Sequence, residues 1–220
     1  MAVILNLETA TTNCSVSVAR DGQLLAIREE NSKNYSHSEQ LHLFIENVLQ
    51  EAQLNRHDLE AVAVSKGPGS YTGLRIGVAA AKGLCFALDL PLISTPTLES
   101  LARQLHITEG YLIPMLDARR MEVYAAVLDA QFETVRETRA EIITEDSFSD
   151  YSAKGKVYLM GSGAIKCKEV LSHPNIEFRD DLIPSAKEMA IMSHQRFTNG
   201  TFEDLAYFEP YYLKEFILGK

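Results

Sequence analysis

The pattern of predicted strands and helices runs through the chain twice, and this repeat is the strongest constraint on its fold. Residues 4–19 (ILNLETATTNCSVSVA) and 113–128 (IPMLDARRMEVYAAVL) are the clearest matching pair. Each is an apolar strand that ends in a carboxylate, followed by a turn and an alternating strand. A repeat of this length is too long for a solenoid. It predicts two similar α/β lobes, each of the order βββαβα, with boundaries at 1–97 and 98–220.

Apolar spacing and turn residues set the predicted boundaries of the elements. The first lobe has predicted strands at 2–7, 14–20 and 23–29, a helix from Ser36 or Ser38 to about Gln53, a strand at 61–65, a helix at 74–88 and a strand at 92–94. The second has a linking helix at 98–106, strands at 111–116, 122–128 and 134–143, a helix at 145–152, a strand at 156–160, a helix opened by GSGA, a helix at 185–197 and an extended tail, EPYYLKEF.

Charge and apolar content exclude several classes of protein. The 220 residues carry 21 Lys and Arg against 30 Asp and Glu, a net charge of -9 that disfavours direct binding to phosphate backbones. The most apolar stretch, 76–88, is shorter than the ~20 residues that span a bilayer. The start MAVILNLETA lacks the basic residues of a signal peptide. Three separated cysteines indicate neither a disulfide framework nor a zinc site. We therefore expect a cytoplasmic protein without membrane contact.

A glycine-rich loop, GPGSYTG at 67–73, lies between a predicted strand and a predicted helix. Such a loop can offer backbone N–H groups and the positive end of a helix dipole to an anion. It does not match the Walker pattern, because Gly73 is followed by Leu74 and Arg75 rather than by Lys and Ser or Thr. The structural alternative is that Ser70 or Thr72 caps the helix while the glycines form tight turns. This alternative is favoured for the loop taken alone.

Two carboxylates, Glu8 and Asp117, end the first strand of each predicted lobe. They could position a water or a metal, or they could serve as turn and N-cap residues, and the sequence leaves both interpretations open. Gly161 and Gly163 in GSGA could allow a nucleotide to approach the backbone, although this pattern is weak. No two histidines are four residues apart, so no helical pair of metal-binding imidazoles is predicted.

The predicted helix at 74–88 is apolar or small almost all round, and such a helix must be covered on nearly every side. Two stripes of small residues would let neighbours approach its backbone: Gly73, Gly77 and Ala81 on one face, and Ala79, Gly83 and Ala87 on another. Leu43 and Leu54 project opposite the main apolar stripe of the preceding helix. These two helices indicate a surface for a partner subunit. The alternative is a core helix that covers the sheet.

The doubled layout is similar to that of the actin-like ATPase superfamily, with its ribonuclease H-like lobes. The segments ILNLETATTNCSVSVA, GPGSYTGLRIG and LDARRMEVYAAVL resemble the TsaB family, which is also labelled glycoprotease-like. This resemblance implies a non-catalytic subunit of tRNA threonylcarbamoyladenosine modification. Its partner would be the paralogue TsaD, which transfers the threonylcarbamoyl group to the adenosine beside the anticodon. The complex would also contain the ATPase TsaE.

The resemblance further implies that pairing with TsaD uses residues 38–53 and 74–88. The expected partner-binding residues are Leu43, Asn47, Gln50, Leu54, Arg75, Ala79, Lys82, Gly83 and Phe86. Vestigial nucleotide loops would contain Glu8, Thr9, Asp117, Gly161 and Gly163, with Glu8 at a position where relatives usually have aspartate.

The remaining expectations concern chemistry and partners. We expect no catalytic residue, no bound metal and no cofactor of this chain's own, because ATP and metal belong to the partner subunits. We expect tRNA contact only through the complex. When TsaD is absent, the sequence leaves both a homodimer and a monomer open. The alternative function is ATP hydrolysis or phosphate transfer by this chain, through Glu8, Asp117 and the Gly161 loop.

Overall fold

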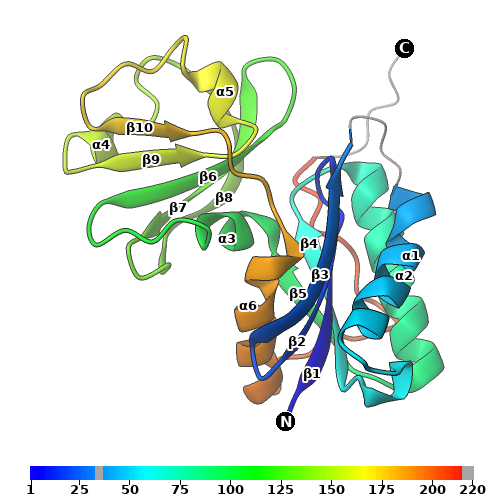
Figure 1. Ribbon diagram of the computed structural model, residues 1–220. Helices are drawn as coiled ribbons and strands as arrows, with labels where there is room; N and C mark the ends of the chain where they lie inside the picture. The colour runs from blue at the N-terminus through cyan, green and yellow to red at the C-terminus, as the bar shows by residue number, and fades with distance from the viewer. Residues whose placement is uncertain (33–36, 215–220) are drawn as a thin grey trace, which may run out of the picture. The chain divides into compact units, whose positions relative to one another are not determined.

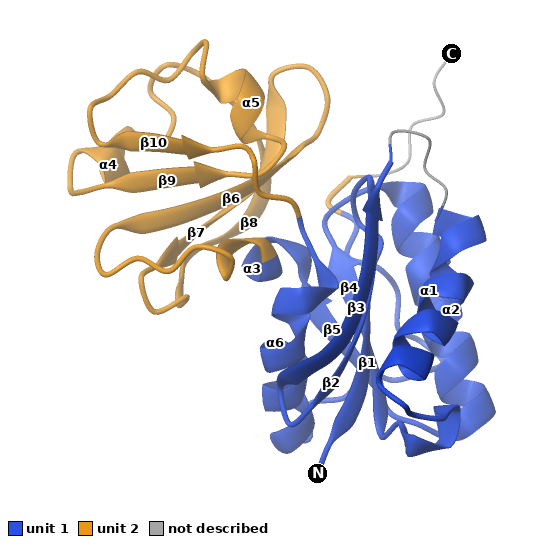
Figure 2. Cartoon of the chain, viewed as in Figure 1, with its two compact units in different colours: residues 1–100, 184–212 blue, residues 101–183, 213–220 orange. Residues whose placement is uncertain are grey.

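The computed structural model describes residues 1–32 and 37–214, which form two compact units (Figure 2). Of the described residues, unit 1 contains 1–32, 37–100 and 184–212, and unit 2 contains 101–183 and 213–214. This differs from the predicted division into 1–97 and 98–220. The chain returns to unit 1 after residue 183, because the helix that follows packs its apolar side on the first sheet. That contact joins residues far apart in sequence, and local patterns carry no signal for it.

Unit 1 is built around a five-stranded sheet of order β3-β2-β1-β4-β5. Its strands are β1 (Val3–Glu8), β2 (Asn13–Arg20), β3 (Gln23–Asn31), β4 (Ala61–Gly67) and β5 (Leu92–Pro96), and its helices are α1 (His37–Glu51), η1 (Arg56–Asp58), α2 (Tyr71–Leu88), the start of α3 (Thr97–Ala102) and α6 (Ala186–Thr198). The first three strands are antiparallel neighbours, whereas β4 and β5 run parallel to β1. The predicted meander and both predicted helices of the first lobe are confirmed.

The two faces of this sheet are covered by different helices (Figure 1). Alternate side chains of a strand point to opposite faces, so Leu5 and Leu7 of β1 pack with α1 and α2, whereas Ile4 packs with α6. Both faces are therefore apolar, and β1 is buried along its whole length. A strand buried on both faces is typical of the parallel centre of an α/β sheet.

Local sequence determines where α2 begins and ends. Ser70 is the N-cap, and its side chain accepts a hydrogen bond from the Gly73 N–H at 3.2 Å. Asp89 ends the helix in the left-handed conformation at φ 54°. The structural interpretation of the GPGSYTG loop is thus confirmed for Ser70. The helix starts three residues earlier than predicted, at Tyr71, because the cap precedes the apolar run.

Unit 2 repeats the arrangement with a sheet of order β10-β9-β6-β7-β8. Its elements are β6 (Tyr111–Asp117), β7 (Glu122–Asp129), β8 (Thr134–Ile142), α4 (Ser149–Ser152), β9 (Val157–Met160), α5 (Ala164–Cys167) and β10 (Ile176–Arg179). The strands β6, β7 and β8 are antiparallel neighbours, and β9 and β10 run parallel to β6. The predicted duplication is confirmed. The helix opened by GSGA has only four residues, and β10 was not predicted.

Three further predictions concern a helix start, the chain end and the membrane. Of the two predicted starts of α1, Ser36 lies outside the described residues. Residues 209–212 of the predicted extended tail form neither helix nor strand, and residues 215 and 216 lie outside the described part. Within the described residues, no helix has the length and apolarity needed to cross a bilayer.

Candidate functional site

The exposed side of α1 carries most of the residues that sequence reasoning assigned to a partner surface. Leu43, Asn47 and Gln50 are exposed, while Leu41 and Ile45 on the other side of the helix are buried in the core. The side chain of Leu43 is 58% exposed. Packing within unit 1 therefore does not explain why position 43 carries an apolar side chain.

The exposed side of α2 is formed by Ala79, Gly83 and Phe86, which follow one another at helical spacing. Phe86 is 84% exposed, and no heavy atom lies within 4 Å of the position that a Cβ on Gly83 would take. A large exposed ring beside a bare helix backbone leaves room for another helix to approach closely. We refer to Leu43, Asn47, Gln50, Ala79, Gly83 and Phe86 together as the α1–α2 face.

Three of the predicted partner residues have contacts within unit 1 instead. Leu54, beyond the end of α1, packs against the core. The Lys82 ammonium donates to the carbonyl oxygens of Ala206 at 3.0 Å and Phe208 at 3.2 Å. Arg75 donates from Nε to the Tyr212 hydroxyl at 3.4 Å. The cations of α2 therefore bind the C-terminal segment of the same unit, a role that the sequence did not reveal.

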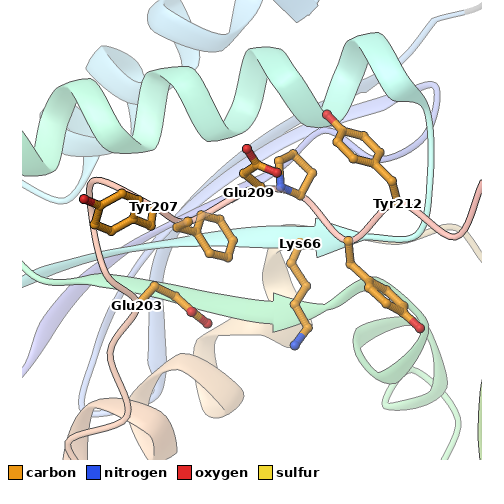
Figure 3. A pocket seen from close by; sticks show the side chains of 8 residues that line it. Lys66, Glu203, Tyr207, Glu209 and Tyr212 are labelled. Atoms are coloured by element: carbon orange, nitrogen blue, oxygen red, sulfur yellow. The ribbon is translucent and has the colours of Figure 1, made fainter. Parts of the chain in front are cut away.

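An open hollow of about 520 Å³ lies beside this C-terminal segment (Figure 3). Its lining consists of Lys66, Glu203, Tyr207, Phe208, Glu209, Pro210, Tyr211 and Tyr212. Sequence reasoning did not single out any of these residues. The signal that was available is the clustering of aromatic residues between positions 207 and 212, but nothing local indicated which element they would pack against.

The loop between β1 and β2, which was a candidate nucleotide loop, is buried. Glu8 Oε1 accepts hydrogen bonds from the Ala10 N–H at 2.6 Å and the Ser65 hydroxyl at 2.8 Å, whereas Oε2 has no hydrogen-bond partner among the described residues. Burial raises the pKa of the Glu8 carboxyl from its ordinary 4.5 to about 7, against the opposing effect of those hydrogen bonds. Glu8 is therefore an internal carboxyl that is largely protonated below neutral pH and about half ionised at pH 7.

The glycine-rich loop closes over this same region. A Cβ on Gly73 would lie 2.1 Å from the Thr9 carbonyl oxygen, and a Cβ on Gly77 would lie 2.3 Å from Thr9 Oγ1. Thr9 Oγ1 donates to the Gly73 carbonyl oxygen at 2.8 Å, and the Ser70 N–H donates to the Ala10 carbonyl oxygen at 2.7 Å. The absence of side chains on Gly73 and Gly77 thus permits close contact between α2 and the chain's own β1–β2 loop.

The corresponding loops of unit 2 are similarly close-packed. Gly161 has φ +88°, and a Cβ there would lie 2.6 Å from Leu101 and 2.7 Å from the Met115 carbonyl oxygen. Gly163 donates its N–H to the same Met115 oxygen at 3.1 Å. Asp117 is exposed and forms an ion pair with Lys166 at 2.5 Å. The GSGA glycines therefore allow the chain to pass the end of β6.

Metal-ligating and nucleophilic side chains are the remaining candidates for chemistry. No group of three or more His, Cys, Asp or Glu side chains within residues 1–32 and 37–214 is placed to hold a metal ion. Cys14, Cys85 and Cys167 are all buried, and burial raises the pKa of each thiol to about 11. These cysteines pack as small apolar groups.

Two sheets of the same strand order, each with three antiparallel strands followed by two parallel ones, define a duplicated fold of the actin-like ATPase class. The ethanolamine utilization protein EutJ from Carboxydothermus hydrogenoformans has a related fold, with a TM-score of 0.51 and 13% identity over 86% of this chain and 89% of its own. YeaZ from Pseudomonas aeruginosa matches more fully, with a TM-score of 0.83 and 24% identity over 97% of this chain and 100% of its own.

A family model described as "tRNA N6-adenosine threonylcarbamoyltransferase" (TsaD) matches residues 27–216. The tRNA threonylcarbamoyladenosine biosynthesis protein TsaB of Escherichia coli is 28% identical over 99% of this chain and 96% of its own. TsaB of Bacillus subtilis is 34% identical over 56% of this chain and 54% of its own. The chain belongs to this threonylcarbamoyltransferase-like family, and its similarity to TsaB of Escherichia coli over almost its whole length confirms the resemblance to TsaB proteins.

Proposed function

We propose that this chain is a non-catalytic subunit that binds and activates TsaD during tRNA threonylcarbamoyladenosine modification of the adenosine next to the anticodon. The name carried by its TsaB relatives supports the pathway. The observation that carries the proposal is the α1–α2 face, where Leu43 and Phe86 are held in solvent beside the open backbone of Gly83.

The free energy that would be gained by burying Leu43 and Phe86 against another protein supports a protein partner. Burial of a large apolar side chain such as leucine or phenylalanine contributes roughly 1.5–3 kcal/mol, which this chain forgoes at both positions while alone. Aromatic residues such as Phe86 are enriched in the buried centres of protein–protein interfaces. A family model named for TsaD matches residues 27–216 of this chain, so a TsaD partner would present helices equivalent to α1 and α2. Two related surfaces then pair about an approximate twofold axis.

The burial of the first candidate nucleotide loop supports a non-catalytic role. Glu8 and Thr9 are fully buried, and Gly73 and Gly77 pack closely against Thr9. We therefore assign ATP and metal chemistry to partner subunits, including TsaE. The net charge of -9 agrees with tRNA contact through the complex rather than through this chain. The proposal places the chain in the cytoplasm, and the same face would pair two copies when TsaD is absent.

The decisive experiment measures threonylcarbamoylation of tRNA by a mixture of TsaD, TsaE and the adenylate-forming enzyme, with and without this chain. We expect the modification to depend on the chain. Gly83→Arg should abolish both co-elution with TsaD and modification, because it fills the α1–α2 face. Gly155→Arg is the matched control: a Cβ there also meets no atom within 4 Å, but Gly155 lies in unit 2. Both variants should remain folded alone.

The outcomes separate the proposal from its rival. Unchanged modification when the chain is omitted, or normal TsaD binding by Gly83→Arg, would refute it. ATP turnover by the isolated chain that is lost in Asp117→Asn would instead favour an ATP-hydrolysing or phosphate-transferring enzyme.

A further inference from the structure

The C-terminal segment, residues 203–212, is attached to the sheet at both ends. At one end the Glu203 N–H donates to the Leu92 carbonyl oxygen of β5 at 2.9 Å. At the other end the Tyr211 N–H donates to the Lys66 carbonyl oxygen of β4 at 2.7 Å. Between these ends, Phe208 packs against the core that α2 also covers. The segment therefore lies beside α2 on the β5 side of the sheet, while α1 lies over β2 and β3.

Lys82 connects α2 to the middle of this segment. Its ammonium donates to the carbonyl oxygens of Ala206 and Phe208, the two residues that flank Tyr207. From the other side, Asp204 Oδ1 accepts the Ala206 N–H at 2.9 Å and the Tyr207 N–H at 3.1 Å. The backbone on both sides of Tyr207 is thus held by hydrogen bonds, two of which come from a charged donor.

The ring of Tyr207, in contrast to its hydrogen-bonded backbone, lies in solvent. It is 84% exposed, as exposed as Phe86, and Phe86 follows Lys82 by one turn of α2. Leu205 and Phe208 of the segment point inward and cover the core. An exposed aromatic side chain at position 207 adds nothing to this packing. The described contacts hold the Tyr207 backbone still and leave its ring in solvent. This combination is suited to recognition, since a side chain on a fixed backbone loses less entropy on binding.

We propose that the C-terminal segment is part of the surface that binds TsaD, with Tyr207 as a contact residue and Lys82 as the positioning residue that fixes it. The inference rests on the proposed function and extends the α1–α2 face beyond the two helices. The occupant is the same TsaD subunit, because Lys82 joins the segment directly to the helix that carries Gly83 and Phe86. Lys82 acts through Tyr207, since its ammonium is already engaged within the chain.

The test is a set of affinity measurements between TsaD and full-length variants, by calorimetric titration. Tyr207→Ala should weaken binding about tenfold, as expected for an aromatic residue central to an interface. Tyr207→Phe, which retains the ring, should lose much less. Lys82→Met keeps the length and apolar stem of the side chain but removes its hydrogen bonds, and it should weaken binding severalfold. Lys154→Met, at an exposed lysine of unit 2, is the matched control and should bind normally.

A double variant separates positioning from direct contact. If Lys82 acts only by holding Tyr207, then Lys82→Met combined with Tyr207→Ala should bind TsaD no more weakly than Tyr207→Ala alone. Hydrogen exchange of the free chain gives an independent readout. In Lys82→Met the Phe208 amide, which donates to the Asp204 carbonyl oxygen at 2.8 Å, should exchange faster than in the wild type.

The results distinguish failure of the inference from failure of the proposed function. If the wild-type chain does not bind TsaD, both are wrong. If the wild type binds, Gly83→Arg does not, and Tyr207→Ala binds as tightly as the wild type, then the α1–α2 face stands and the inference about the C-terminal segment is overturned. Fully additive losses in the double variant would overturn the positioning role of Lys82.

Discussion

Replacing Glu8 with glutamine should make the folded chain more stable at alkaline pH. The carboxyl is fully buried, its Oε2 has no hydrogen-bond partner, and none of the described ion pairs includes it. Burial raises its pKa from 4.5 to about 7. At about 1.36 kcal/mol for each pKa unit, this difference corresponds to ~3 kcal/mol. Folding above pH 7 must therefore bury a charge at a cost of that order.

The sign follows from the proton balance. Between pH 4.5 and about 7, the folded chain keeps the Glu8 proton and the unfolded chain loses it. The contribution of Glu8 to the free energy of unfolding is thus fully present below pH 4.5, falls as the pH rises through this window, and is lost above about 7. The glutamine of the variant would be neutral throughout, with its oxygen accepting the hydrogen bonds of Ala10 and Ser65. The stability difference between variant and wild type should grow across the same window, to at most ~3 kcal/mol at pH 8.

Urea unfolding followed by far-UV circular dichroism at several pH values between 4.5 and 8.5 measures this difference, and it suits a chain without tryptophan. Glu137→Gln, at an exposed carboxyl of β8, is the matched control and should follow the wild type. A parallel pH dependence of wild type and Glu8→Gln would refute the reasoning. So would a variant that is less stable than the wild type at pH 8.

Three further substitutions test α2. Gly77→Ala should destabilise the chain by about 1–2 kcal/mol despite the higher helix propensity of alanine, because its Cβ would meet Thr9 Oγ1 at 2.3 Å. Gly83→Ala in the same helix has the higher helix propensity of alanine, and its Cβ would meet no described atom within 4 Å. We therefore expect the folded chain to be stabilised by ~1 kcal/mol and its Tm to rise by about 2–4 °C. Equal Tm values for the two would contradict this. Ser70→Ala removes the N-cap and should cost ~1 kcal/mol in urea unfolding, whereas an unchanged midpoint would show that the Gly73 hydrogen bond contributes nothing.

Predictions from local patterns were correct where the physical cause is local. The antiparallel meander of β1, β2 and β3 follows from alternation and from the turn at Asp21 and Gly22. Ser70 was one of the two predicted caps of α2, although the helix begins at Tyr71 rather than at the predicted position 74. The resemblance to the TsaB family was carried by contiguous motifs, and the comparisons confirm it. The excess of apolar residues around α2 is visible from spacing alone, and Phe86 is indeed exposed, while the role of the α1–α2 face as a partner surface stays a prediction.

The doubled order of strands and helices, and the apolar surfaces that they must bury, could be predicted from the chain because both depend on neighbours a few residues apart. The packing of α6 in unit 1, and the binding of Lys82 to carbonyl groups more than 120 residues away, became visible only in the folded chain. The close contact of Gly73 and Gly77 with Thr9 is a further feature of this kind. These outcomes depend on which distant segments meet after folding, and side-chain spacing along the chain carries no information about that choice.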